Sequence, residues 1–187
     1  MRLGAILMAS GAGRRFGGNK LLREVEGVPL YCRTMTALAG AGLDRVAVCS
    51  PYTEILSAGE NYGFLPLFNA GAAEGISASI RLGMTAMEGM DGVLFAVCDQ
   101  PFLTTNSIIR LLNTFQESKT AICALSWQGQ KGNPVIFPAD LFGELSALTG
   151  DTGGGAVIRR HPDRLVLVEA FSPKELSDVD KPEDLYA

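Results

Sequence analysis

Short apolar runs alternate with amphipathic stretches along the whole of the 187-residue chain. The apolar, strand-like runs occupy residues 3–8, 45–49, 64–68, 92–98, 120–126, 133–137 and 164–168. The helix-like stretches occupy residues 29–41, 52–59, 78–90, 106–118, 139–148, 154–160 and 182–186. Runs that are short and apolar at nearly every position are typical of strands buried on both faces of a parallel sheet. The alternation therefore predicts a three-layer α/β fold with a mostly parallel central sheet and right-handed crossovers.

Composition limits the classes of function. The net charge of −4 favours neither nucleic acid nor a membrane surface as a partner. No apolar run is long enough to span a bilayer, and the chain starts with a strand-like run rather than a signal peptide. The cysteines stand alone, without metal-binding spacing, at positions 32, 49, 98 and 123. Three of them lie in strand-like runs as reduced, buried side chains would, so we expect a cytoplasmic protein.

A glycine-rich, cationic segment, GAGRRFGGNK over residues 11–20, follows the first predicted strand. Its glycines let backbone N–H groups approach phosphate oxygens, and Arg14, Arg15 and Lys20 add positive charge. A dinucleotide fingerprint, GxGxxG, fails because Gly17 comes one residue too late. A Walker A loop fails because no Ser or Thr follows the lysine. The pattern GxGxRxGxxK fits without a gap, which favours a triphosphate over a nicotinamide cofactor and disfavours an oxidoreductase.

Candidate metal ligands follow the most apolar strand and lie near the C-terminus. Asp99 comes directly after the run 92–98, at the sheet edge where the first loop is also expected. Mg²⁺ prefers one or two carboxylates together with phosphate oxygens and water, which suits Asp99. A turn or capping role for Asp99 is the alternative. Asp178 and Asp180 share one side of an extended segment because they are two residues apart.

The first loop resembles the signature of the MobA-like nucleotidyltransferases, and within them that of the molybdenum cofactor cytidylyltransferase group. Five further segments match this group in the same order: EGISASI (74–80), CDQP (98–101), GNPVIF (132–137), GDTGG (150–154) and DVDKPEDL (178–185). The match covers nearly the whole chain. It implies a Rossmann-like nucleotidyltransferase fold formed by a single domain over residues 1–187.

The resemblance also implies roles for individual residues. The nucleotide would be bound by Ala9, Ser10, Gly11, Ala12, Gly13, Lys20, Asn69, Gly75, Ser77 and Ser79. Arg15, Lys20 and Asp99 would be catalytic. Asp99 and Asp180 would hold Mg²⁺, with Asp178 as the alternative second ligand. The acceptor would contact Asn133, Pro134, Asp151, Gly153 and Gly154. Capping of a helix by Ser77 and structural turns at the acceptor segments are the simpler interpretations.

By resemblance, the reaction transfers CMP from CTP to molybdopterin and releases pyrophosphate. The protein would act as a monomer, and its partners would include a molybdoenzyme or the chaperone of such an enzyme. The chain departs from the group at Asn133, where many relatives have His, at Gly154–Gly155, where they have Ala-Arg, and at Ser10, where Ala is common. Three alternatives remain open: a GTP-dependent enzyme, a sugar- or polyol-phosphate nucleotidyltransferase, and a non-catalytic nucleotide-sensing or cofactor-delivery module.

Overall fold

The computed structural model describes residues 1–11, 19–179 and 184. Its centre is a seven-stranded sheet with strand order β5-β4-β1-β6-β8-β7-β9. The strands are β1 (Leu3–Met8), β4 (Arg45–Ser50), β5 (Leu65–Phe68), β6 (Gly92–Val97), β7 (Ile122–Trp127), β8 (Gln130–Pro138) and β9 (Leu165–Glu169). Each predicted strand run corresponds to one of these strands. Among the described strands of the sheet, only β8 runs antiparallel to its neighbours, so the prediction of a mostly parallel sheet is confirmed.

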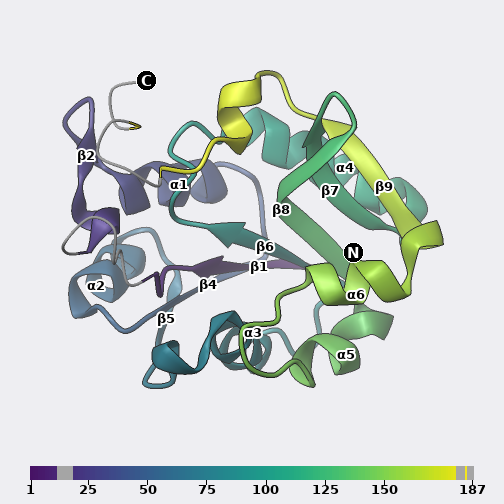
Figure 1. The fold of residues 1–187 in the computed structure, drawn as a ribbon, viewed down its shortest axis with the longest axis horizontal. Coiled ribbons are helices and arrows are strands. Elements are labelled where there is room, and N and C mark those ends of the chain that lie inside the picture. The colour runs from purple at the N-terminus through teal and green to yellow at the C-terminus, as the bar shows by residue number, and fades with distance from the viewer. Residues whose placement is uncertain (12–18, 180–183, 185–187) are drawn as a thin grey trace.

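Helices cover both faces of the sheet and complete three layers (Figure 1). The α-helices are α1 (Leu30–Ala39), α2 (Thr53–Asn61), α3 (Ile76–Met84), α4 (Thr105–Ser118), α5 (Phe142–Ser146) and α6 (Gly155–Arg160). Short 3-10 helices occupy η2 (Lys20–Leu22), η3 (Ala72–Glu74), η4 (Ala139–Leu141), η5 (Pro162–Arg164) and η6 (Pro173–Leu176). One buried cluster joins α1, α2 and α4 to the sheet, and a second joins α3, α5 and α6 to the opposite face.

The side chains of β1 show how the sheet divides these two clusters. Leu3, Ala5 and Leu7 belong to the cluster under α1, α2 and α4, whereas Ile6 belongs to the opposite one. Successive side chains of a strand point to opposite faces, so a strand buried on both sides must be apolar throughout. This is the physical reason why β1, β4, β6 and β7 are nearly unbroken apolar runs in the sequence.

The structure differs from the predicted elements in three places. A two-stranded hairpin, β2 (Glu24–Val25) and β3 (Val28–Pro29), was not predicted because two residues per strand show no periodicity. The helix predicted over 78–90 is α3, which ends at Met84. The chain then turns at Gly89, with φ of +75°, and so buries Met87 and Met90 in the second cluster. The helix predicted over 139–148 is divided into η4 and α5, and the one over 182–186 lies outside the described residues.

Within the part of the chain that the structure describes, no helix is long and apolar enough to cross a membrane. All four cysteines lie in this part and are free thiols.

Strand order determines where a ligand can bind. The chain passes from β1 to β4 on one side and later places β6 on the other side of β1. Such a reversal leaves a crevice at the carboxyl ends of the adjacent strands, where α/β sheets bind ligands. Met8, at the end of β1, pairs with Cys49 of β4 and Val97 of β6. The loops that follow these three strands therefore meet at one edge of the sheet.

Candidate active site

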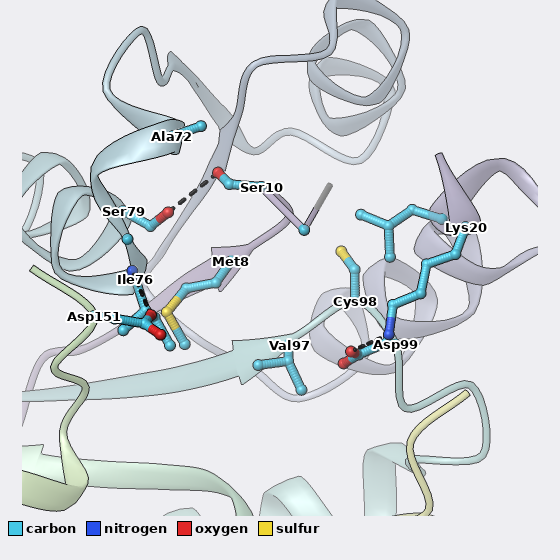
Figure 2. A pocket seen from close by; sticks show the side chains of 13 residues that line it. Met8, Ser10, Lys20, Ala72, Ile76, Ser79, Val97, Cys98, Asp99 and Asp151 are labelled. Atoms are coloured by element: carbon cyan, nitrogen blue, oxygen red, sulfur yellow. Dashed lines mark hydrogen bonds and ion pairs between the residues drawn. The ribbon is translucent and has the colours of Figure 1, made fainter. Parts of the chain in front are cut away.

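A cavity of about 290 Å³ lies at this edge (Figure 2). It is lined by Met8, Ser10, Gly11, Lys20, Leu21, Ala72, Gly75, Ile76, Ser79, Val97, Cys98, Asp99 and Asp151. Its polar groups lie at two ends, with Lys20 and Asp99 at one and Ser10, Ser79 and Asp151 toward the other. Apolar side chains of Met8 and Val97 lie between them. We call these the phosphate end and the base end, after the roles that the sequence resemblance implies for Lys20 and for Ser10 and Ser79.

The phosphate end is built around one ion pair. Lys20 Nζ lies 2.9 Å from Asp99 Oδ2, and the same nitrogen donates to the Val179 carbonyl at 2.9 Å. Lys20 is 9% exposed as a whole residue, while the Asp99 side chain keeps 25% of its surface exposed. Burial strengthens the electrostatic interaction of such a pair because little water screens it. The arrangement holds a cation and a carboxylate side by side at the edge of the cavity.

Cys98 is the thiol nearest this pair in sequence. It is buried, and this burial raises its pKa well above the ordinary value, with the negative charge of Asp99 acting in the same direction. Cys98 is therefore a neutral thiol at physiological pH and forms part of the apolar wall.

The first loop starts at the end of β1. Ala9 is buried beneath the cavity, where its N–H donates to the Cys49 carbonyl at 2.9 Å and its carbonyl accepts from Ser50 Oγ at 2.9 Å. Both of its backbone groups are therefore engaged within the protein. Gly11 lines the cavity. The remaining predicted loop residues, Ala12, Gly13 and Arg15, lie outside the described residues.

The base end carries a neutral hydrogen-bond network. Asn69 Nδ2 donates to Ser10 Oγ at 3.0 Å and to Ser79 Oγ at 2.9 Å, and Ser79 Oγ donates to Ser10 Oγ at 3.1 Å. Asn69 is only 2% exposed, so it supports the two hydroxyls from below and does not itself line the cavity. The three residues come from three separate loops and helices, and Figure 2 shows the contact between Ser10 and Ser79.

The loop before α3 and the loop before α6 touch each other. Gly75 has φ of +110°, and a Cβ at this position would lie 2.6 Å from the Gly150 carbonyl oxygen. The Ser77 N–H donates to that carbonyl at 3.3 Å, and the Ile76 N–H donates to Asp151 Oδ1 at 3.5 Å. Gly75 is required here for both its backbone conformation and its lack of a side chain.

The predicted acceptor residues are only partly gathered at the cavity. Asp151 lines it, whereas Asn133, Pro134, Gly153 and Gly154 do not. Because β8 runs antiparallel to β6, its first residues, with Asn133 and Pro134, lie toward the same sheet edge as Asp99. Ser77 is also buried away from the cavity, where it accepts a hydrogen bond from Arg81.

A divalent metal fits the phosphate end. Asp99 offers a partly exposed carboxylate, a hard oxygen donor suited to Mg²⁺ or Mn²⁺. Among the described residues, no cluster of three or more His, Cys, Asp or Glu side chains forms a site. Mg²⁺ commonly uses one or two carboxylates and completes its shell with phosphate oxygens and water, so a single described ligand is compatible with it. Asp180, the second predicted ligand, lies outside the described residues.

Two groups of the site could not have been identified from local sequence. The Val179 carbonyl is a backbone atom, which carries no residue-type signal. Arg81 links the Ser77 hydroxyl, the Leu148 carbonyl and the Glu74 carboxylate. Ser77 and Arg81 are four residues apart on α3, but Glu74 and Leu148 lie outside this helix, so helical spacing alone could not suggest these contacts.

Comparisons with known proteins identify the family of this chain. Residues 5–165 match the model of the MobA-like NTP transferase domain. The chain is 27% identical to the nicotine blue oxidoreductase of Paenarthrobacter nicotinovorans, over 97% of this chain and 93% of the relative. It is 25% identical to a probable molybdenum cofactor guanylyltransferase of Thermococcus sibiricus, over 70% of this chain and 65% of the relative.

Two solved structures share the fold. A nucleotidyl transferase from Methanothermobacter thermautotroptrophicus superposes with a TM-score of 0.81 at 24% identity, covering 99% of this chain and 94% of that one. Rv0371C of Mycobacterium tuberculosis H37Rv, in complex with manganese, gives 0.80 at 21% identity over 100% and 97%. The neighbours confirm the Rossmann-like fold that the resemblance implied. Since the family model spans most of the chain, this protein belongs to the MobA-like NTP transferase family and is a nucleotidyltransferase.

Proposed function

We propose that this nucleotidyltransferase transfers CMP from CTP to molybdopterin, with Mg²⁺ as the metal, and releases pyrophosphate. The observation that carries the proposal is the Lys20–Asp99 pair, 2.9 Å apart, at the sheet edge where the glycine-rich loop also starts. A buried ammonium and a partly exposed carboxylate are the groups that a metal-bound triphosphate requires.

The phosphate end would act by charge and position. Lys20 donates to the phosphate oxygens, together with N–H groups of the first loop and with Arg15. Asp99, with Asp180 or Asp178, would hold Mg²⁺, which neutralises phosphate charge when bound. A phosphate oxygen of the acceptor then attacks the α-phosphorus in line, and the bond from this phosphorus to the bridging oxygen breaks. Pyrophosphate takes the electron pair, and a phosphate acceptor needs little help from a general base.

The base end would bind the nucleoside. The hydroxyls of Ser10 and Ser79, supported by Asn69, can exchange hydrogen bonds with the edge of a base. Gly75 and Ser77 shape the loop that would enclose the ribose. The nucleoside would occupy the side of this end near Ser10 and Ser79, and molybdopterin would lie on the side of Asp151, whose carboxylate suits the amino and ring N–H donors of a pterin.

GTP is the alternative nucleotide. It is favoured by the name of the Thermococcus sibiricus relative, a probable guanylyltransferase. An oxidoreductase function would follow the name of the Paenarthrobacter nicotinovorans relative, but the first loop of this chain lacks a dinucleotide fingerprint.

The test has two stages. Thermal unfolding is first measured with CTP, GTP, ATP and UTP, each with and without Mg²⁺. A ligand at 100 times its Kd stabilises the folded protein by about 2.7 kcal/mol, so the preferred nucleotide gives the largest shift. Transfer of α-labelled phosphate from each nucleotide to molybdopterin, to a sugar phosphate and to a polyol phosphate then identifies the acceptor.

We expect CTP with Mg²⁺ to give the largest shift and label to appear on molybdopterin only. Labelled transfer from GTP in preference to CTP would establish the alternative nucleotide. Pyrophosphate release from CTP that does not depend on molybdopterin would contradict the proposed acceptor. Oxidation of a reduced nicotinamide cofactor, without nucleotidyl transfer, would contradict the proposal as a whole.

A further inference from the structure

The segment over residues 171–179, which we call the C-terminal strap, runs from β9 back across the molecule toward the phosphate end (Figure 1, yellow). It contributes no described side chain to the cavity lining. Nevertheless, it is bonded to the residues that form the phosphate end.

The far end of the strap is tied to the site by hydrogen bonds. The Val179 N–H donates to the Asp99 carbonyl at 2.9 Å, and the Val179 carbonyl accepts from Lys20 Nζ at 2.9 Å. Gln100 Nε2 donates to Asp178 Oδ1 at 2.9 Å. One of the hydrogen bonds of the Lys20 ammonium is thus made to a backbone carbonyl of the strap.

The near end of the strap is anchored by a buried carboxylate. Glu175 is 2% exposed and accepts from the Thr104 N–H at 3.1 Å, from Thr104 Oγ1 at 2.8 Å and from the Phe171 N–H at 3.0 Å. Thr104 is the N-cap of α4, so the carboxylate lies at the positive end of a helix dipole. Among the described residues, Glu175 forms no ion pair with a basic side chain.

Burying a carboxylate is costly, and a strap that only had to pack could use an apolar residue at this position. A carboxylate with three directional donors instead specifies one position and register for the segment that follows. Only three residues lie between this anchor and Val179, whose carbonyl Lys20 contacts, so a shift of the anchor would be transmitted to Lys20.

We propose that Glu175 is a positioning residue for nucleotidyl transfer. It holds the C-terminal strap at the start of α4 and so fixes the Val179 carbonyl that orients the Lys20 ammonium. The inference rests on the nucleotidyltransferase activity of the family and not on the particular nucleotide or acceptor proposed above.

The variants are Glu175→Ala, which removes the anchor, and Glu175→Gln, which keeps an oxygen to accept from Thr104. The matched control is Glu169→Gln. Glu169 also accepts from one backbone N–H, that of Gln128 at 2.8 Å, and from one hydroxyl, Ser126 Oγ at 3.3 Å. It does not line the cavity, so its loss affects local structure only.

The first measurement needs no substrate. The rate at which an amine-acylating reagent modifies Lys20 is followed by mass spectrometry in each folded variant. Loss of one charge-assisted hydrogen bond corresponds to about a tenfold change in an equilibrium, so we expect Lys20 to react about tenfold faster in Glu175→Ala. Glu175→Gln is expected to give a smaller increase and Glu169→Gln none.

The second measurement separates kcat from KM with whichever substrates support turnover. Glu175→Ala is expected to lower kcat by about tenfold and to change the KM for the nucleotide by less than about threefold, because the binding surface itself is intact. Glu175→Gln should restore part of the loss. If Glu175→Ala does not fold, Thr104→Val, which removes the hydroxyl donor, takes its place with the same expectation for Lys20.

Equal Lys20 reactivity in the Glu175 variants and in Glu169→Gln would overturn the proposal and leave Glu175 with a purely structural role. Failure of CTP or molybdopterin as substrates would not affect the Lys20 measurement, so the two proposals fail separately.

Discussion

The two ends of the cavity solve the problem of buried polar groups in different ways. At the base end, neutral hydrogen bonds join Asn69, Ser10 and Ser79, and Ser10 Oγ donates to the Cys49 carbonyl. At the phosphate end, Lys20 is held by a carboxylate and by a carbonyl from a distant segment. Neutral groups that hydrogen-bond to one another can be buried at little cost, whereas a buried charge needs a partner of opposite charge. A bound phosphate can replace that partner.

The difference indicates what each end is suited to do. A network of neutral hydrogen bonds can exchange partners with a ligand without leaving a charge unpaired, which suits recognition of a neutral base. The Lys20–Asp99 pair can exchange its mutual contact for contacts with a phosphate group and a metal ion, which suits catalysis of nucleotidyl transfer.

The largest effect is expected at the phosphate end. Asp99→Asn keeps the size of the side chain but removes the charge that pairs with Lys20 and would hold the metal. We expect kcat to fall by about 10²–10³-fold, the scale of losing one electrostatic contact in a transition state. Single-turnover transfer measures this loss. The control is Asp140→Asn, whose exposed carboxylate pairs with Arg164 outside the cavity. Similar kcat values for both variants would refute the role of Asp99.

The next effect concerns the contact between the two loops at the base end. Gly75→Ala forces a side chain into left-handed backbone with φ of +110° and against the Gly150 carbonyl. We expect the free energy of unfolding to fall by about 2–4 kcal/mol. Urea denaturation provides the measurement. Gly143→Ala in α5, where a new Cβ meets nothing within 4 Å, should instead be neutral or stabilising. A neutral Gly75→Ala would show that the loops are not held in this arrangement.

A smaller effect is expected from removing the neutral network. Asn69→Leu leaves the hydroxyls of Ser10 and Ser79 without their shared donor. The stability should fall by about 1–3 kcal/mol, and the KM for the nucleotide should rise with less change in kcat. Asn113→Leu, on the exposed side of α4, serves as the control because surface changes of this kind are nearly neutral. A loss of kcat at unchanged KM would show that Asn69 contributes to the chemical step and not to nucleotide binding.

The smallest effect comes from an exposed pair far from the cavity. Hydrogen bonding to Arg164 lowers the pKa of Asp140, so the ionised carboxylate favours the folded state. This stabilisation is present above the unfolded pKa, near 4, and is lost as pH falls through the lowered folded value. Melting temperatures from pH 5 to pH 3 should therefore fall slightly more for the wild type than for Asp140→Asn. Since the Asp140 side chain is 59% exposed, the difference should be small, and parallel curves would assign this pair no role in stability.

Much of the fold could be predicted from the sequence because its signals are local. The predicted runs correspond to the seven strands. Strands β1, β4, β6 and β7 are apolar at nearly every position because both of their faces are covered, whereas the edge strands β5 and β9 are apolar although several of their side chains are exposed. The β2–β3 hairpin was missed because each of its strands has only two residues. The end of α3 at Met84 was missed because the methionines beyond it keep a helix-like spacing while the chain turns.

For the candidate site, the sequence identified Lys20 and Asp99 because a glycine-rich loop and a carboxylate each directly follow a predicted strand. It could not show that these two side chains form a pair. It also grouped Asn133 and Pro134 with Asp151 on the acceptor side, although only Asp151 lines the cavity. Matching segments indicate roles, but not which of their atoms face the same space.

By itself, the sequence determined the order of strands and helices along the chain. It also placed Lys20 and Asp99 after predicted strands, because both properties depend on neighbouring residues in the chain. Only the tertiary structure decided which ends meet. Lys20 and Asp99 are 79 residues apart, and Lys20 and Val179 are 159 apart. They meet because β1 lies between β4 and β6 in the sheet and because the C-terminal strap is anchored at α4. That arrangement follows from packing across the whole chain, which no local pattern contains.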